Sequence, residues 1–193
     1  MFIESPKPYK FNYIQFKYPT QDWEKKCYWN LRKQVFCAEQ KIFGDDDLDI
    51  IDQNAIPIIA LDECMGLVHN VIGAVRIDER TPGEWWGSRL CVDTHYRTHS
   101  RFNAHFLFDK EVNQIFTLSV GASLIYKAVT TANYLGCQRF FAHVQAQNVK
   151  FFRRLHWTAI KPVTIHGKSH YLMEADLSQY PASSWAKTLN EAA

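Results

Sequence analysis

The chain has 193 residues, which on the usual range of about 100–200 residues per domain predicts one domain spanning residues 1–193. Apolar residues make up 47% and charged residues 22% of the sequence, so the chain can bury a core and lacks the composition of a disordered protein. The net charge is +2, and no basic block interleaves with aromatic residues. This balance excludes the electrostatic pattern of a nucleic-acid-binding protein.

Nothing in the sequence predicts export or insertion into a membrane. No window approaches the roughly 18 consecutive apolar residues that a membrane-spanning helix needs, and residues 1–8 are polar and contain two prolines. The five cysteines are widely spaced and without a CxxC pair, which favours reduced thiols over disulfides or a zinc site. We therefore expect a cytoplasmic protein with no membrane partner and no bound metal.

The first quarter of the chain predicts a strand, a helix and a loop. Residues 10–18 nearly alternate between apolar and polar and are rich in aromatic residues, as in a half-buried strand. A helix is expected after Thr20, which can cap it. Its core-facing stripe should consist of Trp23, Cys27, Leu31 and Val35. The aspartate-rich stretch 44–52 indicates an acidic surface loop that could rim a pocket.

The middle of the chain predicts a hairpin and a long helix. Strands are expected over residues 57–62, 70–78 and 85–93. Thr81-Pro82-Gly83 is a turn sequence, so the second and third of these strands should form an antiparallel hairpin. Residues 118–135 have one broad apolar face and are followed by Gly136, the pattern of a helix with glycine just past its end.

The last third predicts a strand at residues 139–144, a short helix that opens at Asn148, and strands near residues 159–165 and 170–175. Taken together, the order of elements predicts an α+β fold in which a single mixed sheet has helices on both faces. No GxGxxG or GxxxxGK sequence follows a predicted strand. The sequence therefore lacks the fingerprints of proteins that bind nicotinamide dinucleotides and of P-loop proteins.

Three blocks of sequence carry the functional signal. They are Leu90-Cys91-Val92-Asp93-Thr94-His95-Tyr96-Arg97, the small-residue start of the long helix at residues 119–123, and residues 148–157. Over roughly residues 30–175 the chain resembles the GNAT superfamily of acyl-coenzyme A N-acyltransferases, whose pattern is a strand ending in LxVDxxYR, a glycine loop entering a helix, and a later helix led by asparagine. Within that superfamily it resembles the bacterial and cyanobacterial branch named for nitrogen starvation, through residues 31–40, 124–129 and 144–148.

The resemblance implies a GNAT-like, mixed and mostly antiparallel central sheet. It also implies transfer of an acyl group, with acetyl as the first expectation, from acetyl-coenzyme A to a primary amine of a small molecule. The resemblance further implies that the coenzyme binds to Leu90, Cys91, Val92, Ser119, Val120, Gly121, Ala122, Ser123, Asn148 and Phe152. A helix N-terminus with small side chains offers free N–H groups to a diphosphate. An amide near residues 90–92 would pair with the pantetheine arm and stabilise the oxyanion.

Three departures from the family pattern bear on the chemistry. Ser119 replaces the first glycine of the loop, and Phe116 stands where glutamine or arginine is usual. Residues 98–118 make a longer segment than the family normally has, which we expect either to fold over the coenzyme or to block it. Phe152 occupies the position of a tyrosine that often protonates the leaving thiolate. The group that protonates the leaving thiolate is then Tyr126 or a water molecule, or the thiolate leaves without being protonated by the protein.

The general base has three candidates. Glu84 comes first, because it precedes Trp85 and Trp86 at the mouth of a strand, and it is followed by His143 on a later strand and Glu39 after the first helix. Each also has a purely structural interpretation, as an exposed hairpin glutamate, a hydrogen-bonded core histidine or a solvated glutamate. Of the two tryptophans, we expect one in the core and one covering the other face, where it could line an acceptor pocket.

Two further groups of residues, a set of histidines and a run of aspartates, each have a simpler interpretation than a binding site. His95, His99 and His105 do not have the spacing of a metal site, so no metal ligand is assigned. The aspartates of residues 44–52 could attract a cationic amine, or only face solvent.

Two other functions stay open at this point. Leu31-Arg32 with Val35-Phe36, and the stretch 86–90, resemble the LRxxVF and WExSRF patterns of acyl-homoserine-lactone autoinducer synthases, although Gly87 stands where those enzymes have glutamate after tryptophan. A non-catalytic acyl-coenzyme A sensor is the third reading, because of Phe152, Phe116 and the long insertion. A homodimer is compatible with the sequence but is not predicted by it.

Overall fold

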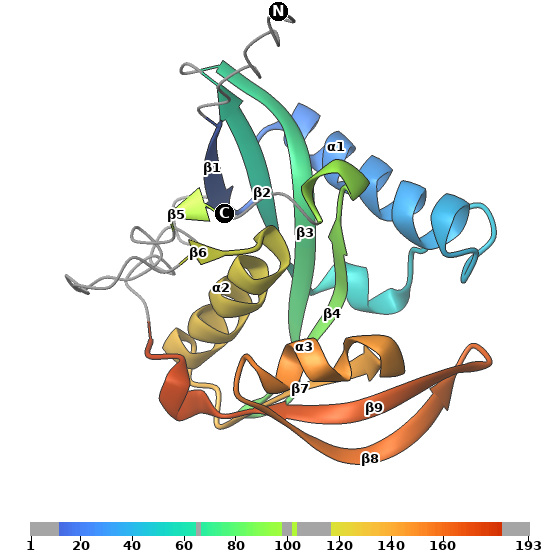
Figure 1. Ribbon diagram of the computed structural model, residues 1–193, viewed down its shortest axis with the longest axis vertical. Helices are drawn as coiled ribbons and strands as arrows, with labels where there is room; N and C mark the ends of the chain where they lie inside the picture. The colour runs from blue at the N-terminus through green and yellow to red at the C-terminus, as the bar shows by residue number, and fades with distance from the viewer. Residues whose placement is uncertain (1–11, 65–66, 98–101, 104–116, 183–193) are drawn as a thin grey trace, which may run out of the picture.

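The computed structural model describes residues 12–64, 67–97, 102–103 and 117–182. Their main feature is a seven-stranded sheet in the order β1-β2-β3-β4-β7-β9-β8 (Figure 1). All neighbouring strands in it are antiparallel except β4 and β7, which are parallel. The strands are β1 Asn12–Lys17, β2 Ile56–Cys64, β3 Leu67–Thr81, β4 Glu84–Val92, β7 Arg139–Gln145, β8 Trp157–Ile165 and β9 Lys168–Ala175. A separate two-stranded sheet joins β5 Phe102–Asn103 to β6 Thr117–Leu118.

Helices cover both faces of the large sheet (Figure 1). Helix α1 (Asp22–Lys33) packs on β3 and β4 from one side, while α2 (Val120–Tyr134) packs on β2, β3 and β4 from the other. The short helix α3 (Val149–Arg153) lies on the α2 side against β8. Because strand side chains alternate between faces, the sheet separates a larger core under α2 and α3 from a smaller one under α1. The predicted α+β fold with one mixed, mostly antiparallel sheet is confirmed.

The predicted hairpin is confirmed. Strands β3 and β4 pair antiparallel and turn at Pro82-Gly83, where Gly83 has a φ of 78°, a conformation that costs glycine little. Trp85 is in the larger core and Trp86 faces the opposite side, so the two tryptophans divide between faces as expected.

Helix α1 differs from its prediction in which residues it buries. Trp23 is 41% exposed, whereas Glu24, Tyr28, Leu31 and Arg32 are buried. The N-cap position is Gln21 rather than Thr20, and the Glu24 carboxylate accepts hydrogen bonds from the N–H groups of both. The predicted stripe is confirmed at Leu31 and Val35, which are buried, and at Cys27, which is partly buried. It is wrong at Trp23, because Glu24 and Arg32 occupy buried positions together with their partners.

The remaining elements follow their predictions closely. Helix α2 and strand β7 are found within two residues of the expected bounds, while α3 is shorter, and β8 and β9 begin earlier than expected. Residues 98–101 and 104–116 of the long insertion lie outside the described residues, and so do Phe116, His99 and His105. In the part of the chain that is described, the four cysteines Cys27, Cys37, Cys91 and Cys137 are free thiols, and no group of three metal-ligating side chains occurs.

No helix among the described residues has both the length and the apolar character needed to cross a bilayer.

Close packing of α2 on β3 gives a test of the fold. A Cβ atom at Gly73 would lie 2.8 Å from Leu124 Cδ1 and 2.9 Å from Val120 Cγ1, both in fully buried side chains. We expect Gly73→Ala to lower the free energy of unfolding by about 1–3 kcal/mol in urea titrations, since an overpacked core must shift. Gly44→Ala is the matched control, because a Cβ there meets nothing within 4 Å. Equal effects of the two substitutions would contradict this packing.

Candidate active site

Strands β4 and β7 part in the middle of the sheet. They pair only from Glu84 with Arg139 to Gly87 with Ala142. Beyond that point β4 stays paired with β3 as far as Val92, and β7 stays paired with β9 as far as Gln145. The backbone edge of residues 88–92 that faces β7 therefore has no strand partner among the described residues. This edge is available to an extended ligand with amide groups.

A bulge in β4 accompanies the parting. Between the pairs formed by Arg76 with Ser88 and by Ala74 with Cys91, β4 contains one more residue than β3. Arg89 lies in this bulge with a φ of 53°, a conformation that is costly for a residue other than glycine. Its side chain is held by Asp47 at 2.8 Å and Asp49 at 3.0 Å. We infer that these ion pairs stabilise the bulge, which bends β4 away from β7.

A buried network of charges extends from Arg89 under α1. Arg32 and Arg76 are 0% and 1% exposed, and every guanidinium in the network bonds at least two aspartate groups. Its members are Arg32, Arg76, Arg89, Asp47, Asp49 and Asp52. Burial alone would raise the pKa of Asp52, but hydrogen bonds from Arg32 and Arg76 lower it to about 2.

The acidic stretch lies at the surface as expected, since Asp45 and Asp46 are exposed, but not all of it is solvated. Three of its aspartates pair with Arg32 and Arg76, which are buried, and with Arg89, which is partly buried. These partners are distant in sequence, so the local excess of aspartate did not reveal the pairing. Asp49 still lines the cavity described next, so the idea that this stretch rims a pocket is confirmed.

A cavity of about 280 Å³ occupies the gap between the strands. Its wall draws residues from both cores, so it passes through the plane of the sheet. The half on the α2 side is apolar and includes Ile125, Ala128, Val129, Phe140, Val144, Phe152 and Trp157. The half on the α1 side is polar and aromatic and includes Phe43, Arg76, Arg80, Trp86, Arg89, His143, His166 and His170. Two substrates could therefore meet end to end inside the sheet.

The start of α2 retains free backbone donors. Ser119 caps the helix by accepting a hydrogen bond from the N–H of Ala122 at 3.3 Å, and the first helical bond runs from Ser123 N–H to the Ser119 carbonyl. The N–H groups of Val120 and Gly121 precede that bond and cannot pair within the helix. Among the described residues, a Cβ at Gly121 would meet Val92 Cγ2 alone, at 3.7 Å, which is an ordinary contact. These two amides are the donors that this helix end could offer to an anion.

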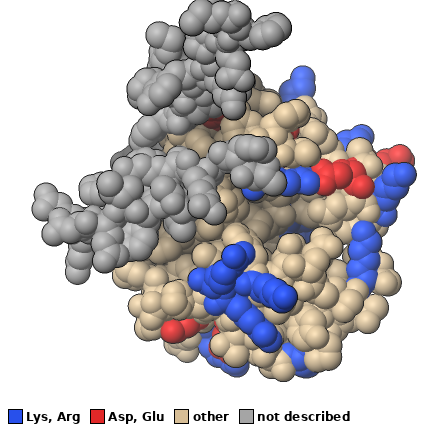
Figure 2. Space-filling model, viewed as in Figure 1, with Lys and Arg blue, Asp and Glu red and all other residues tan. Residues whose placement is uncertain are grey.

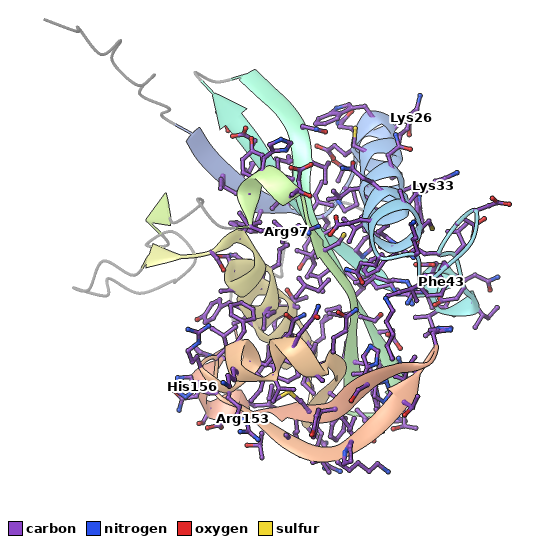
Figure 3. The ribbon with its side chains drawn as sticks, turned by 45° about the vertical axis from the view of Figure 1, so that its right-hand side comes forward. Lys26, Lys33, Phe43, Arg97, Arg153 and His156 are labelled. Carbon is purple, nitrogen blue, oxygen red and sulfur yellow. The ribbon has the colours of Figure 1, made fainter. Side chains whose placement is uncertain are left out.

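Basic side chains border the outer face of the site. Figure 2 shows this face hollowed above Lys and Arg side chains that gather over α3. The exposed basic residues there are Lys150, Arg153 and Arg154. Figure 3 places Arg153 and His156 at the end of α3, away from Phe43, which lies beyond the end of α1 and contacts His166 in the loop between β8 and β9.

The LxVDxxYR block has a structural explanation in this chain. Asp93 accepts a hydrogen bond from the N–H of His95, and Tyr96 donates to Asp62 on β2. Arg97 donates to the carbonyl of Val92 at 2.8 Å and to the carboxylate of Glu39. The block therefore fixes the end of β4 against its surroundings, and it leaves Glu39 committed to an ion pair.

The structure brings some predicted site residues to the cavity and not others. Leu90, His143, Asn148 and Phe152 line it. The remaining assigned residues do not: Glu84, Cys91, Val92, Tyr126 and the helix start Ser119, Val120, Gly121, Ala122 and Ser123. Cys91 is buried against α1, where burial raises the pKa of its thiol to about 12.

Two of the predicted catalytic groups are placed away from the gap. Glu84 lies at the closed end of the β4–β7 pair, where it accepts a hydrogen bond from Trp86 Nε1 at 3.0 Å. The ring of Tyr126 packs against Tyr180, with 5.6 Å between the ring centroids. Neither lines the cavity, so their catalytic roles stay predictions without support from the geometry.

His143 is the predicted base that faces the gap. It lies one residue beyond the last β4–β7 pair, and its ring centroid is 5.0 Å from that of Trp86. Burial, followed by the charges of Arg80, His170 and Lys161, lowers the pKa of His143 below its usual value. A neutral imidazole at neutral pH can accept a proton.

Sequence reasoning missed the arginines of the cavity. Arg76, Arg80 and Arg89 all line it, yet none was chosen as a site residue. One feature of the sequence could have revealed them. Arginines occur on hydrophobic strands, where an unpaired charge is too costly to bury, and a run of aspartates elsewhere in the chain could supply their partners.

Comparison of the structure with solved structures identifies the architecture. Neither a family model nor a curated protein matches the sequence. An acyl-CoA N-acyltransferase from Pseudomonas aeruginosa matches with a TM-score of 0.61 at 16% identity, covering 85% of this chain and 99% of that one. An acetyltransferase of the GNAT family from Staphylococcus aureus matches with a TM-score of 0.56 at 12% identity, covering 84% and 98%. The chain has the GNAT fold. The AHL synthase LasI also shares it, with a TM-score of 0.56, 15% identity and coverage of 89% and 95%.

At these identities the likeness concerns the GNAT fold alone. The resemblance to the nitrogen-starvation branch stays a prediction. In this structure the cavity lies where the strands part, and Gly121 at the start of α2 lies beside Val92 at the end of β4.

Proposed function

We propose that this protein is an acyltransferase that moves an acyl group from coenzyme A to the amine of a small molecule. The observation that carries the proposal is the cavity that crosses the sheet where β4 and β7 part. Its free strand edge suits the amides of a pantetheine arm, and the amides of Val120 and Gly121 suit a diphosphate. Acetyl is the first expectation for the acyl group, and the apolar lining on the α2 side of the cavity would suit a longer chain as well.

The reaction needs positioning and one proton transfer. The amine nitrogen attacks the thioester carbonyl carbon, the carbon–sulfur bond breaks, and the coenzyme leaves as a thiolate while the amine proton passes to His143 Nε2 or Nδ1. A backbone N–H on the open edge of β4 would stabilise the oxyanion. Phe152 has no proton to give and Tyr126 lies outside the cavity lining, so the thiolate leaves without help from either side chain.

Calorimetry and thiol release test this proposal together. Acetyl-coenzyme A should bind in an isothermal titration, and adding an amine from a broad panel should release free thiol. No binding at millimolar acetyl-coenzyme A would overturn the proposal. Tight binding without thiol release across the panel would instead favour the acyl-coenzyme A sensor.

His143 gives a prediction about pH. Because its pKa is lowered, the protonated and inactive form should appear only in acid, so kcat/KM should rise with pH through a value below 6.5 and then level off. We expect His143→Gln to lower kcat by about 100-fold, the usual contribution of a general base, and to remove this rise. His95→Gln is the control, because that imidazole is 90% exposed and outside the cavity lining. An unchanged pH profile in His143→Gln would exclude it as the base.

Lactone synthesis is a second candidate function, and one observation favours it. The residues that carried the resemblance to autoinducer synthases meet in space, because Arg32 and Arg89 share Asp47, and the Arg89 guanidinium lies 5.7 Å from the centroid of the Phe36 ring. Incubation with S-adenosylmethionine and acyl donors distinguishes the two functions. A lactone product would support the synthase, and amine acylation without lactone would support the acyltransferase.

A further inference from the structure

Arg80 is held against the cavity wall. It lies on β3, and its guanidinium carbon is 4.1 Å from the centroid of the Trp86 ring. Its Nε donates to the buried carboxylate of Asp78 at 2.9 Å. Stacking on an aromatic face and one ion pair fix both the plane and the rotation of the guanidinium, which is the preorganised state that makes arginine selective for planar anions.

The two terminal nitrogens of Arg80 remain available. Within the described part of the chain, Arg80 donates through Nε only. The other two cavity arginines differ, because Arg76 donates from all three guanidinium nitrogens and Arg89 from Nε and one terminal nitrogen, each to groups of the protein. Arg80 is thus the cavity arginine whose paired terminal N–H groups can form a fork with a carboxylate.

The pairing of charges around the cavity leaves free donors on one arginine at this end. Arg76 and Arg89 are paired with Asp47, Asp49 and Asp52, whereas Arg80 is paired with Asp78 through Nε alone and keeps its terminal N–H groups for an anion. A cationic acceptor in the cavity would find no free carboxylate among the described lining residues. This argues against the cationic amine acceptor that the aspartate-rich sequence indicated.

His143 lies close to Arg80 on the same wall. The Arg80 guanidinium and the His143 ring both contact Trp86, at 4.1 and 5.0 Å from its ring centroid. The positive charge of Arg80 contributes to the lowered pKa of His143, so the two groups are near enough to interact. A molecule that contacts both groups needs an anionic group and an amine that together span their two contacts with one indole ring, and an amino acid carries both groups.

We propose that the acceptor is an amino acid whose carboxylate binds the terminal nitrogens of Arg80 while its amine faces His143. This inference rests on the proposed acyl transfer and specifies its acceptor. The product is then an N-acyl amino acid, formed as the amine nitrogen displaces the coenzyme thiolate and its proton passes to His143. The carboxylate itself takes no part in bond making and serves to orient the amine.

Matched acceptor pairs test the inference. The probes are L-phenylalanine with 2-phenylethylamine and L-lysine with cadaverine, which differ only in the carboxylate. We expect the wild-type protein to favour each amino acid by about 10- to 100-fold in kcat/KM, the range for a charged hydrogen-bonded pair. Arg80→Gln should lose that factor for the amino acids relative to the amines. The comparison is made at a pH where His143 is neutral in both proteins, because the substitution also removes a charge that lowers the pKa of His143.

Arg139→Gln is the matched control. Arg139 also stacks on an aromatic ring, Phe141, at 4.6 Å and pairs with a carboxylate, Glu174, but it does not line the cavity. It should leave the preference for amino acids intact. Arg80→Lys, which keeps the charge without the fork, should retain part of the preference and provides a second variant if Arg80→Gln does not fold.

The outcomes separate this inference from the proposed function. Equal use of amino acids and amines by the wild type, or equal losses for both in Arg80→Gln, would overturn the amino acid acceptor while acyl transfer stands. If no probe releases thiol, acyl transfer fails, and ligand-observed NMR of L-phenylalanine still decides the inference. Binding that is weakened in Arg80→Gln but not in Arg139→Gln would support the site, and unchanged or absent binding would overturn it.

Discussion

Replacing Arg32 with methionine should lower the free energy of unfolding by about 3–5 kcal/mol, the usual cost of removing one partner from a buried set of ion pairs. The Arg32 side chain is completely buried and bonds Asp47 at 2.8 Å and Asp52 at 2.6 Å. Methionine fills much of the same volume, so the loss would come from the two aspartates rather than from an empty cavity. Urea unfolding followed by circular dichroism measures the change.

Lys33→Met is the control for this substitution. Lys33 is the next residue of α1 and points away from the sheet (Figure 3), so its replacement should change stability by less than about 0.5 kcal/mol. Comparable effects of the two substitutions would show that the ion network does not hold this face of the sheet.

The same network predicts how stability depends on pH. Asp52 has a pKa of about 2 in the folded chain against about 3.9 when unfolded, and the pKa of Asp49 is lowered as well. Because the folded values are the lower ones, these groups stabilise the protein fully above about pH 4 and lose that contribution as the pH falls toward 2. In Arg32→Met this acid dependence should be weaker.

Gly121→Glu should abolish high-affinity binding of coenzyme A without harming the fold. The new carboxylate lies in the first turn of α2, where the helix dipole favours it, and within the described part of the chain a Cβ at this position makes one ordinary contact, with Val92. Next to a bound diphosphate it would repel by about 4 kcal/mol at 4 Å and the effective dielectric of a protein surface. We therefore expect the dissociation constant of coenzyme A to rise by at least about 100-fold.

Gly121→Gln separates charge from size in this experiment. Glutamine has the same shape as glutamate but no charge, so its effect on affinity should be only a few-fold. Thermal melting should show both variants folded. If glutamate and glutamine weaken binding equally, or if neither does, the diphosphate does not bind at the start of α2.

The elements of the fold were predictable where local pattern and tertiary burial agree. The hairpin of β3 and β4 follows from Pro82-Gly83 between apolar strands, and the bounds of α2 follow from its apolar face and Gly136. In α1 the local pattern and the tertiary burial disagree. The apolar pattern would bury Trp23, but the ion pairs of Arg32 with buried aspartates require a different face of the helix to be buried. Ion pairs between distant elements leave no periodic signal in the sequence.

The site was predictable only in part, for a related reason. Sequence motifs located Leu90, His143, Asn148 and Phe152, all of which line the cavity. The family resemblance also implied that the strands part beside residues 90–92, which the register of β4 and β7 confirms. It could not show the cause, which is a bulge whose left-handed residue is an arginine held from outside the strand. Arg80 was missed for the same reason: its stacking on Trp86 exists only once β3 and β4 have paired.

A crystal structure with coenzyme A bound tests the central claim most directly. The account predicts the diphosphate on the N–H groups of Val120 and Gly121, with the pantetheine arm between the open edge of β4 and strand β7 and the thiol in the cavity beside His143. A coenzyme bound elsewhere on the protein, with the gap between β4 and β7 empty, would contradict it.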